Sequence, residues 1–410
     1  MKKMSLIGAM LLVGTIGASA QADLVKEAEQ GFKSAKDYPS YRKVIDTMTP
    51  AFTNEATKSD AKTYFLPGKA GFKVYDNYII ARSLGQEVNP VEMGNALLDG
   101  YGYFLKAFEY DSLPDAKGKI KPKYSKDMIN EIVGHVNDFD QVAVGFWQAH
   151  DFDGAYNAWE ALLDIPSNPR YKKSNIKAYP DSTVANIRFN QGLAAWQAQK
   201  LDKALQAFDR SIALGHSNPQ LYEYAYSVAY QAGDSANMQR YAEEGLKKFG
   251  TEDPRFLQWT VNGYILHKEY DKAAKMLQDA IAADPNNAAY HLSLGVLAES
   301  QNNIDEAIKE YTLATKLNDK DAQAFLNLGR ALAEKYDALD QATGSNMSQA
   351  DYNKYAAETL NPILKQSAEA FETSYKINEE MTDALRYLKN IYYRLNDNTN
   401  LERVNKLLMQ

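Results

Sequence analysis

The chain of 410 residues contains no cysteine, few prolines and almost no strand pattern. Without thiols it has no disulfide framework, cysteine nucleophile, thiolate zinc site or lipid-modified N-terminal cysteine. Runs that alternate β-branched and polar residues between turns are scarce, which argues against strands. Hydrophobic residues make up 45% of the chain, so it has enough apolar surface to bury a core, and wholesale disorder is excluded.

Catalytic and metal-binding signatures are also missing. None of the five histidines is paired at metal-ligand spacing, and there is no His-Glu-x-x-His, Gly-x-Ser-x-Gly or phosphate-binding glycine loop. Asp151 to Gly154 resembles part of a calcium loop but lacks the later acidic ligands, so we predict a turn between helices. We therefore expect no enzyme, no cofactor and no metal. A hydrolase with a site assembled from distant residues is the catalytic alternative.

The charge balance excludes a general nucleic-acid coat, because 46 basic residues face 53 acidic ones. Residues 21–135 hold 16 basic and 16 acidic side chains, whereas residues 136–410 hold 28 and 37. The C-terminal two-thirds is therefore the acidic part. One lysine cluster lies beside turn residues and predicts a solvated loop, with an anion site as the alternative. Its members are Lys117, Lys119, Lys121, Lys123 and Lys126.

The first twenty residues have the features of a secretory signal. Lys2 and Lys3 precede an apolar stretch from Met4 to Ile16, and Ala18 to Ala20 forms an Ala-x-Ala cleavage site. The stretch is too short for a comfortable membrane span, and no second apolar run of membrane length follows. We expect signal peptide 1–20 to be removed, giving an exported chain, periplasmic or secreted, with no transmembrane segment.

A fixed repeat runs through most of the chain. Small and large residues recur with a spacing of four and then three, which is one face of a helix. Ala204, Met238, Ala273 and Ala307 begin successive copies at offsets of 34, 35 and 34 residues. Each copy is preceded by a second helical stripe, and turn residues lie between the two. The glycines of the first helices, such as Gly192, are expected to let the paired helices lie close together.

This pattern resembles the tetratricopeptide repeat, a helix–turn–helix unit of 34 residues. Residues 288–321 match it through Leu294-Gly295, Ala307, Tyr311 and Ala314, and depart from it at His291, Ala298 and Asp319. The resemblance implies an all-α, right-handed superhelical solenoid of antiparallel helix pairs. The units that we predict are 136–169, 185–218, 219–252, 254–287, 288–321, 322–381 and a partial 382–410, with insertions at about 170–184 and 340–362. His291 is expected to be a buried, satisfied core histidine.

The N-terminal third, residues 21–135, is helical without the clean period. Leu24–Lys36 and Tyr41–Phe52 predict one hairpin, and Ala61–Leu84 and Pro90–Tyr110 predict a second. Ser125–Ala149 is expected to form one long helix that leads into the array at residues 136–410. We interpret this third as degenerate repeats, and a separate helical domain is the alternative.

The resemblance also implies where a ligand binds. In tetratricopeptide arrays the first helix of each unit lines a concave groove through positions 2, 5, 9 and 12. Position 12 is aromatic in three successive units, as Trp147, Trp196 and Tyr230. Other predicted groove residues are Phe189, Leu193, Gln258, Asn262, Glu299 and Arg330. Trp159 falls at a core position and Trp259 falls off the groove stripe. The Lys-and-Asn clamp of some family members is not matched.

These features predict a binding scaffold that holds a protein or peptide in its groove within the cell envelope. Stacked Trp and Tyr faces also suit a glycan, which is the alternative ligand. A further alternative is that the rings pack against the insertion at 170–184 or a neighbouring helix. Four tripeptides resemble the Asp-Ser/Thr-apolar acceptor of a periplasmic O-glycosylation system in one Gram-negative lineage. They begin at Asp46, Asp111, Asp181 and Asp234.

Overall fold

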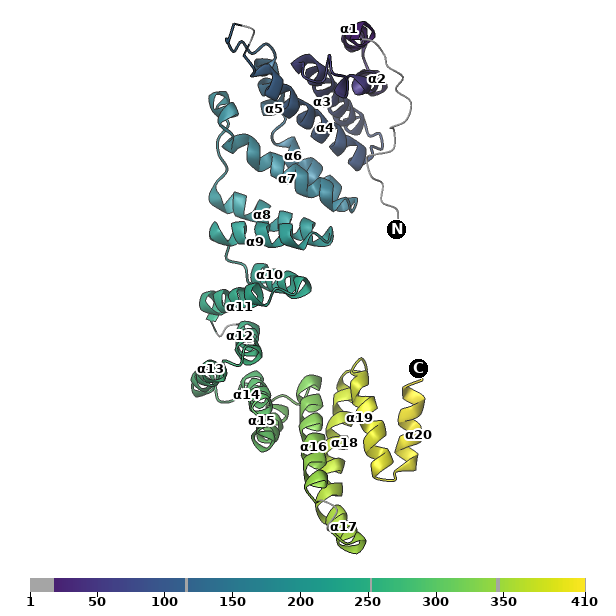
Figure 1. Cartoon of the computed structure of the whole chain (residues 1–410), viewed down its shortest axis with the longest axis vertical. Coiled ribbons are helices and arrows are strands. Elements are labelled where there is room, and N and C mark those ends of the chain that lie inside the picture. The colour runs from purple at the N-terminus through teal and green to yellow at the C-terminus, as the bar shows by residue number, and fades with distance from the viewer. Residues whose placement is uncertain (1–17, 115–116, 251–252, 344–346, 410) are drawn as a thin grey trace. The chain divides into compact units, whose positions relative to one another are not determined.

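The computed structural model describes residues 18–114, 117–250, 253–343 and 347–409 (Figure 1). The chain divides into two compact units, Met1–Leu221 and Tyr222–Gln410. Within the described ranges all regular structure is helical, apart from one isolated antiparallel bridge between Pro114 and Ile120. This confirms the predicted all-α class. No described helix has both the length and the apolar character needed to cross a membrane. The expected leader up to residue 17 lies outside the described residues.

The first unit consists of consecutive helices joined by turns and loops. They are α1 (Ala18–Ser34), α2 (Tyr38–Met48), the 3₁₀ turn η1 (Thr49–Phe52), α3 (Ala61–Ser83), α4 (Pro90–Asp111), α5 (Ser125–Gly134), α6 (Asp138–Gln148), α7 (Phe152–Ser167), the 3₁₀ turn η2 (Pro169–Ser174), α8 (Asp181–Gln197) and α9 (Leu201–Ala213). Helices α3 and α4, α6 and α7, and α8 and α9 pack as neighbouring pairs. One hydrophobic core runs from Val25 of α1 to Ala194 of α8.

The second unit continues the pattern after α10 (Pro219–Ala232), which begins at the end of the first unit. Its other helices are α11 (Ser235–Phe249), α12 (Pro254–Leu266), α13 (Tyr270–Ala283), α14 (Ala288–Ser300), α15 (Ile304–Leu317), α16 (Ala322–Ala342), α17 (Gln349–Tyr355), the π-helix η4 (Ala356–Leu360), α18 (Asn361–Ile377), α19 (Thr382–Arg394) and α20 (Asn398–Leu407). Helices α14 and α15 pack as one pair, and α16 packs against α18.

Helix starts follow the capping residues in the sequence. The carboxylate of Asp151 accepts a hydrogen bond from the backbone N–H of Gly154 at 2.9 Å, so it caps α7. The turn predicted at Asp151 to Gly154 is only partly correct: Asp151 ends the connection between α6 and α7, but Phe152 to Gly154 form the first turn of α7. Asp234 and Asn287 cap α11 and α14 in the same way. Asp234, one of the acceptor-like aspartates, thus has a role in starting a helix.

Glycines inside the helix pairs allow the close approach expected from the sequence. A Cβ added at Gly192 of α8 would lie 2.3 Å from Cε1 of Phe208 on α9. A Cβ added at Gly295 of α14 would lie 2.4 Å from Cε1 of Tyr311 on α15. Real side chains do not approach so closely, so the aromatic ring of the second helix occupies the space that glycine leaves. The glycine and the ring are therefore one packing unit.

The structure corrects the prediction of one long helix from Ser125 to Ala149. Helix α5 ends at Gly134 and α6 begins at Asp138. The ring of His135 at the break lies 2.7 Å from the Glu131 carbonyl oxygen through Nδ1 and 2.9 Å from Asp76 through Nε2. This side chain satisfies a last-turn carbonyl that the helix itself leaves open. Periodicity alone did not reveal the break, because both segments are apolar on one face.

The lysine-rich loop lies between α4 and α5 and is tied down by Asp111. This buried carboxylate accepts hydrogen bonds from the backbone N–H groups of Lys123, Tyr124 and Ser125, at 2.7–3.0 Å. The Ser125 hydroxyl donates a further one at 2.6 Å. Although burial by itself raises the pKa of Asp111, these donors outweigh it and hold the pKa below its ordinary value.

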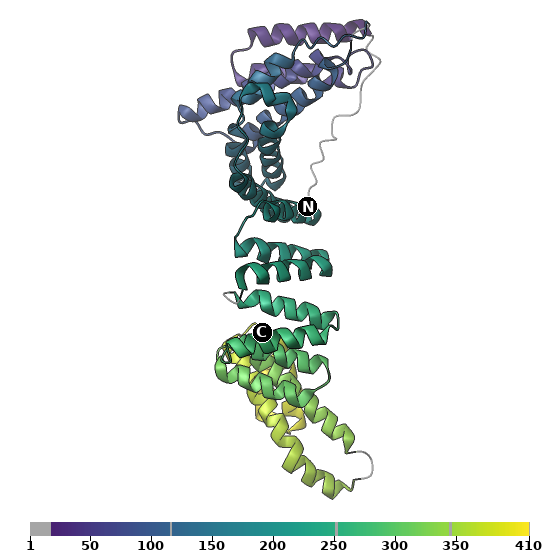
Figure 2. The same ribbon diagram turned by 90° about the vertical axis from the view of Figure 1, so that its left-hand side faces the viewer.

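The two predicted insertions have different structures. In 170–184, Tyr171 is buried in the first unit's core and Arg170 lies 4.2 Å from the centroid of the Phe108 ring. In 340–362, the end of α16, α17 and η4 form a helical hairpin that extends beyond the neighbouring pairs of the second unit (Figure 2). The hydroxyl of Tyr352 donates to Asp340 at 2.8 Å and closes this hairpin.

Candidate functional site

An apolar pocket of about 290 Å³ lies in the first unit, on helices α6, α7 and α8. Its lining residues are Val144, Trp147, Trp159, Asn190 and Leu193. Trp147 and Leu193 are two of the groove residues that the sequence predicts. The pocket thus joins the first helices of two consecutive predicted units. None of its lining residues comes from the insertion at 170–184, so that segment does not fill it.

Two tryptophans make the pocket walls in different ways. Trp159 is only 4% exposed, and its indole Nε1–H donates to the Asp140 carboxylate at 3.0 Å. Trp147 is half-buried and meets the Phe152 ring edge-on, with centroids 5.2 Å apart. Both rings are therefore fixed in the absence of any ligand, which lowers the entropy cost of binding.

A polar network fixes α8 against α7 behind the pocket. Gln191, which is fully buried, donates to Glu160 at 2.9 Å and to the Tyr156 carbonyl at 3.2 Å. Arg188 pairs with Glu160 and donates to Gln191 at 2.7 Å. Burial raises the pKa of Glu160, but Gln191 and Arg188 more than offset it, so the pKa lies below its ordinary value. This network holds Asn190 and Leu193 in place on α8.

The other predicted residues of the first unit lie outside this pocket. Phe189 packs against α9, with its ring 6.1 Å from Phe208 and 5.3 Å from His216. It is therefore a half-buried packing residue of the helix pair. Trp196, one helical turn beyond Leu193, is half-buried at the end of α8. The predicted aromatic ladder thus contributes one ring, Trp147, to the pocket.

Tyr230 belongs to the second unit, where its side chain is 69% exposed at the end of α10. Tyr226, one turn earlier, stacks on Trp259 of α12 with ring centroids 4.3 Å apart and an angle of 9°. These two rings each cover one face of the other. Gln258 and Asn262 are half-buried on α12, and neither lines the pocket of Trp147 and Leu193.

Arg330 lines a second groove pocket, of about 440 Å³, between α16 and α19. The other lining residues are Leu326, Asp383, Arg386, Tyr387 and Asn390. Arg330 pairs with Glu299 at 2.8 Å, which joins two residues that the sequence placed on the groove. Arg386 pairs with Asp383 at 2.6 Å. Both arginines are therefore neutralised locally.

Several lining residues were missed by the sequence reasoning. Val144 and Leu326 occupy groove positions 9 and 5 of units already drawn, so the repeat register would have found them. Arg386 and Asn390 were missed because the last unit was drawn only as a partial one. Trp159 was assigned to the core, and the structure places it both in the core and in the pocket wall. No local motif signals such a double role.

One cluster of metal-ligand type lies among the described residues, formed by Asp76, Glu131 and His135. Their ligand atoms lie within 4.8 Å of one another. The ammonium group of Lys73 lies among them, 2.7 Å from Asp76 and 3.3 Å from Glu131. A lysine already supplies positive charge there, so the cluster is an ion-pair network that ties α3 to α5. The sequence missed it because the partners lie far apart along the chain.

This network predicts a pH dependence of stability. Burial lowers the pKa of His135, but the hydrogen bonds to Asp76 and the Glu131 carbonyl outweigh it and hold the pKa above its ordinary value. A group whose pKa is raised by folding stabilises the protein fully below its unfolded pKa and loses that contribution as pH rises through the folded value. We expect the free energy of unfolding to decline as pH rises from the unfolded-state pKa of His135 through its higher folded-state pKa. Urea unfolding at several pH values measures it, and the His135→Gln variant is expected to lack this component. An equally steep decline in the variant contradicts the assignment.

Stacked antiparallel helix pairs with small-residue contacts inside each pair define an all-α helical-repeat protein. Residues 176–219 and 267–322 match the family model described as tetratricopeptide repeat. The match confirms the resemblance seen in the sequence for these two segments, which carry tetratricopeptide repeats. The first matched segment contains all of α8 and therefore part of the pocket wall.

Two curated proteins illustrate the sequence similarity. TPR repeat-containing protein MJ1428 of Methanocaldococcus jannaschii is 23% identical over 299 residues, a match covering 54% of this chain and 52% of that protein. ER membrane protein complex subunit 2 of Xenopus tropicalis is 24% identical over 276 residues, covering 64% of this chain and 86% of that protein. The chain thus spans about half the length of the Methanocaldococcus relative.

Similar solved structures include the MamA protein, with 17% identity and a TM-score of 0.35 over 46% of this chain and 96% of that one. Another is YrrB, described as a TPR protein with an unusual peptide-binding site. It has 13% identity and a TM-score of 0.35 over 49% of this chain and 96% of that one.

Proposed function

We propose that this protein is an exported scaffold that binds a protein or peptide partner through its groove, and that the pocket of Trp147 and Leu193 is the principal contact. The observation that carries the proposal is that this pocket is apolar, open to solvent and lined by α7 and by the first helices of two consecutive predicted units, α6 and α8. Its rim residue Val144 is 42% exposed, so apolar surface remains uncovered. Such surface on a rigid framework favours an apolar side chain of a partner.

The pocket volume suits this use. A dry cavity of about 150 Å³ holds a benzene molecule. A pocket of about 290 Å³ therefore accommodates one large apolar side chain and part of its backbone. Asn190 is the polar lining residue, and its side-chain amide has no hydrogen-bond partner among the described residues. An amide can both donate to and accept from a peptide backbone, so Asn190 supplies the directional contact.

Replacement of Trp147 by alanine tests the proposal. A phage-displayed library of dodecapeptides would be selected on the full chain, and the affinities of enriched peptides would be measured for each variant. We expect Trp147→Ala to weaken binding by roughly 1–4 kcal/mol. Because Trp147 is half-buried, its stability loss should be smaller than the ~3–5 kcal/mol of a buried tryptophan truncation.

Trp259→Ala is the matched control, since Trp259 is also half-buried and in ring contact but lies in the other unit. It should leave peptide affinity unchanged. If no peptide is enriched, or if Trp147→Ala lowers stability and leaves affinity intact, the pocket is not the binding site. Selection of oligosaccharides from a glycan array by the same pocket would instead support the glycan alternative.

The export part of the proposal depends on the N-terminal pattern of Lys2, Lys3, the apolar stretch and Ala18 to Ala20. We expect the mature chain to begin at Gln21 and to carry no lipid, because no cysteine is present. Intact-mass spectrometry of the protein from envelope and medium fractions measures this. Retention of Met1 in those fractions contradicts it, and Ala20→Lys should block the cleavage.

A further inference from the structure

We infer that the preferred partner is an extended peptide with an apolar side chain and, two residues away, a lysine or arginine. This inference rests on the proposed function, and it names the chemistry of the ligand for the same pocket. The apolar side chain enters the pocket of Trp147 and Leu193, and the cationic side chain pairs with Asp140 at its rim.

Trp159, a residue of the pocket wall, holds Asp140 beside the pocket. One carboxylate oxygen accepts the indole N–H of Trp159 at 3.0 Å, and Trp159 lines the pocket. The Asp140 side chain is exposed, and no Lys, Arg or His among the described residues forms an ion pair with it. Its second oxygen is thus available to a ligand. A fixed carboxylate without a cation beside an apolar pocket complements a basic, apolar ligand.

The surroundings do not supply the missing positive charge. Asp138, on the same helical turn, is acidic. Burial, and then the charge of Asp140, raises the pKa of Tyr179 in the insertion, and this hydroxyl carries no positive charge. Arg82 approaches α6 through Gln141, at 3.4 Å, and its charge acts on Asp138. The array as a whole, residues 136–410, also carries more acidic than basic side chains, 37 against 28. A cationic ligand is therefore attracted at long range as well as at Asp140.

The spacing between the apolar and the basic side chain of the peptide follows from backbone geometry. Asp140 and Val144 are four residues apart on α6 and lie on one face, separated by about 6 Å along the helix axis. In an extended peptide, residues i and i+2 point to the same side and are separated by about 6.6 Å. A peptide lying along α6 therefore places an apolar side chain over Val144 and a basic one over Asp140 when one residue lies between them.

The experiment compares capped, fluorescein-labelled nonapeptides that differ at one position. Each has one leucine among serines and glycines, with lysine, serine or glutamate two residues away on either side. Fluorescence anisotropy measures their affinity for the full chain. We expect the lysine peptide to bind about threefold to tenfold more tightly than the glutamate peptide, and the difference to shrink as salt rises. In Asp140→Asn, which keeps an acceptor for Trp159, the two affinities should agree within about twofold.

Asp202→Asn is the matched control, because it removes one negative charge from exposed surface on α9. It should leave the preference for lysine unchanged. If leucine peptides bind with no preference between lysine and glutamate, the inference is wrong while the proposed function stands. An Asp140→Asn variant that loses stability but keeps the preference also contradicts it. If no leucine peptide binds and the dodecapeptide selection also fails, the proposed function itself fails.

Discussion

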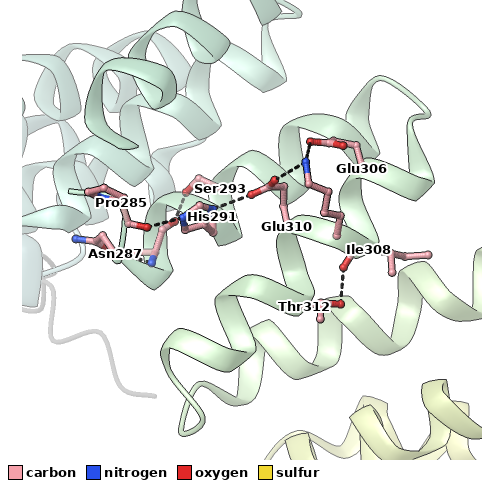
Figure 3. Close-up of polar contacts among 10 residues, drawn as sticks. Pro285, Asn287, His291, Ser293, Glu306, Ile308, Glu310 and Thr312 are labelled. Carbon is pink, nitrogen blue, oxygen red and sulfur yellow. Dashed lines mark hydrogen bonds and ion pairs between the residues drawn. The ribbon is translucent and has the colours of Figure 1, made fainter. Parts of the chain in front are cut away.

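Replacing His291 by alanine is expected to lower the free energy of unfolding of the second unit by about 3–5 kcal/mol. His291 lies on α14 and Glu310 on α15, and both side chains are almost completely buried. Nδ1 of His291 lies 2.7 Å from the Glu310 carboxylate, and its Nε2 lies 2.9 Å from the Pro285 carbonyl oxygen (Figure 3). Both ring nitrogens have partners, which confirms the predicted buried, satisfied histidine.

The size of the effect comes from what remains after the substitution. Glu310 stays buried, and the side chain that still contacts it is Lys309, whose ammonium lies 3.5 Å away and also binds Glu306 at 2.8 Å. A buried carboxylate that loses its partner pays a desolvation cost that no new contact offsets. Figure 3 shows His291, Glu310 and Glu306 along one line of contacts across the helix pair.

Urea unfolding of the full chain, together with amide hydrogen exchange in α14 and α15, measures this loss locally. Replacing both partners, His291→Leu with Glu310→Leu, should recover most of the stability, since paired apolar residues often replace a buried hydrogen-bonded pair at little cost. A single variant as stable as the parent, or a double variant no better than the single one, contradicts this account.

Phe208→Ala is expected to cost about 3–5 kcal/mol, in the first unit. The ring is fully buried on α9 and occupies the space beside Gly192 of α8. Its removal leaves a cavity between α8 and α9, and α8 is also fixed to α7 by the Gln191 network. The structure can therefore collapse only partly around the cavity. Tyr393→Ala, which removes a ring that is mostly exposed, should change stability by less than about 0.5 kcal/mol. Equal losses in the two variants contradict the packing argument.

Gly192→Ala tests the other half of the same contact. Alanine normally stabilises a helix relative to glycine by about 0.5–1 kcal/mol. At Gly192 the added methyl group overlaps the Phe208 ring, so we expect a net loss of about 1–2 kcal/mol. Gly102 on α4 has open space around it, and Gly102→Ala should show the ordinary gain. A loss of stability in Gly192→Ala together with a gain in Gly102→Ala, both measured by urea unfolding, supports the packing of Phe208 against Gly192. A change of the same sign in both variants contradicts it.

The candidate site was only partly predictable. The repeat register indicated that Trp147 and Leu193 face the groove, and the structure places both in one pocket. The same register grouped Phe189 with them, but its ring packs against Phe208 and His216. A register fixes which side of a helix a residue occupies. It does not fix how far the neighbouring helix covers that side, because this depends on the size of the residues opposite.

The sequence by itself determined the all-α class, the helix pairs and the glycine contacts within them, because a spacing of four and three places residues on one face of a helix wherever it occurs. Only the tertiary structure decided that α5 ends just before His135 and that the indole of Trp159 donates a hydrogen bond to Asp140. It also decided that the Lys73 ammonium lies within the cluster of Asp76. Each of these depends on side chains from different helices meeting in space. Such meetings follow from helix packing distances, which a pattern along one chain does not contain.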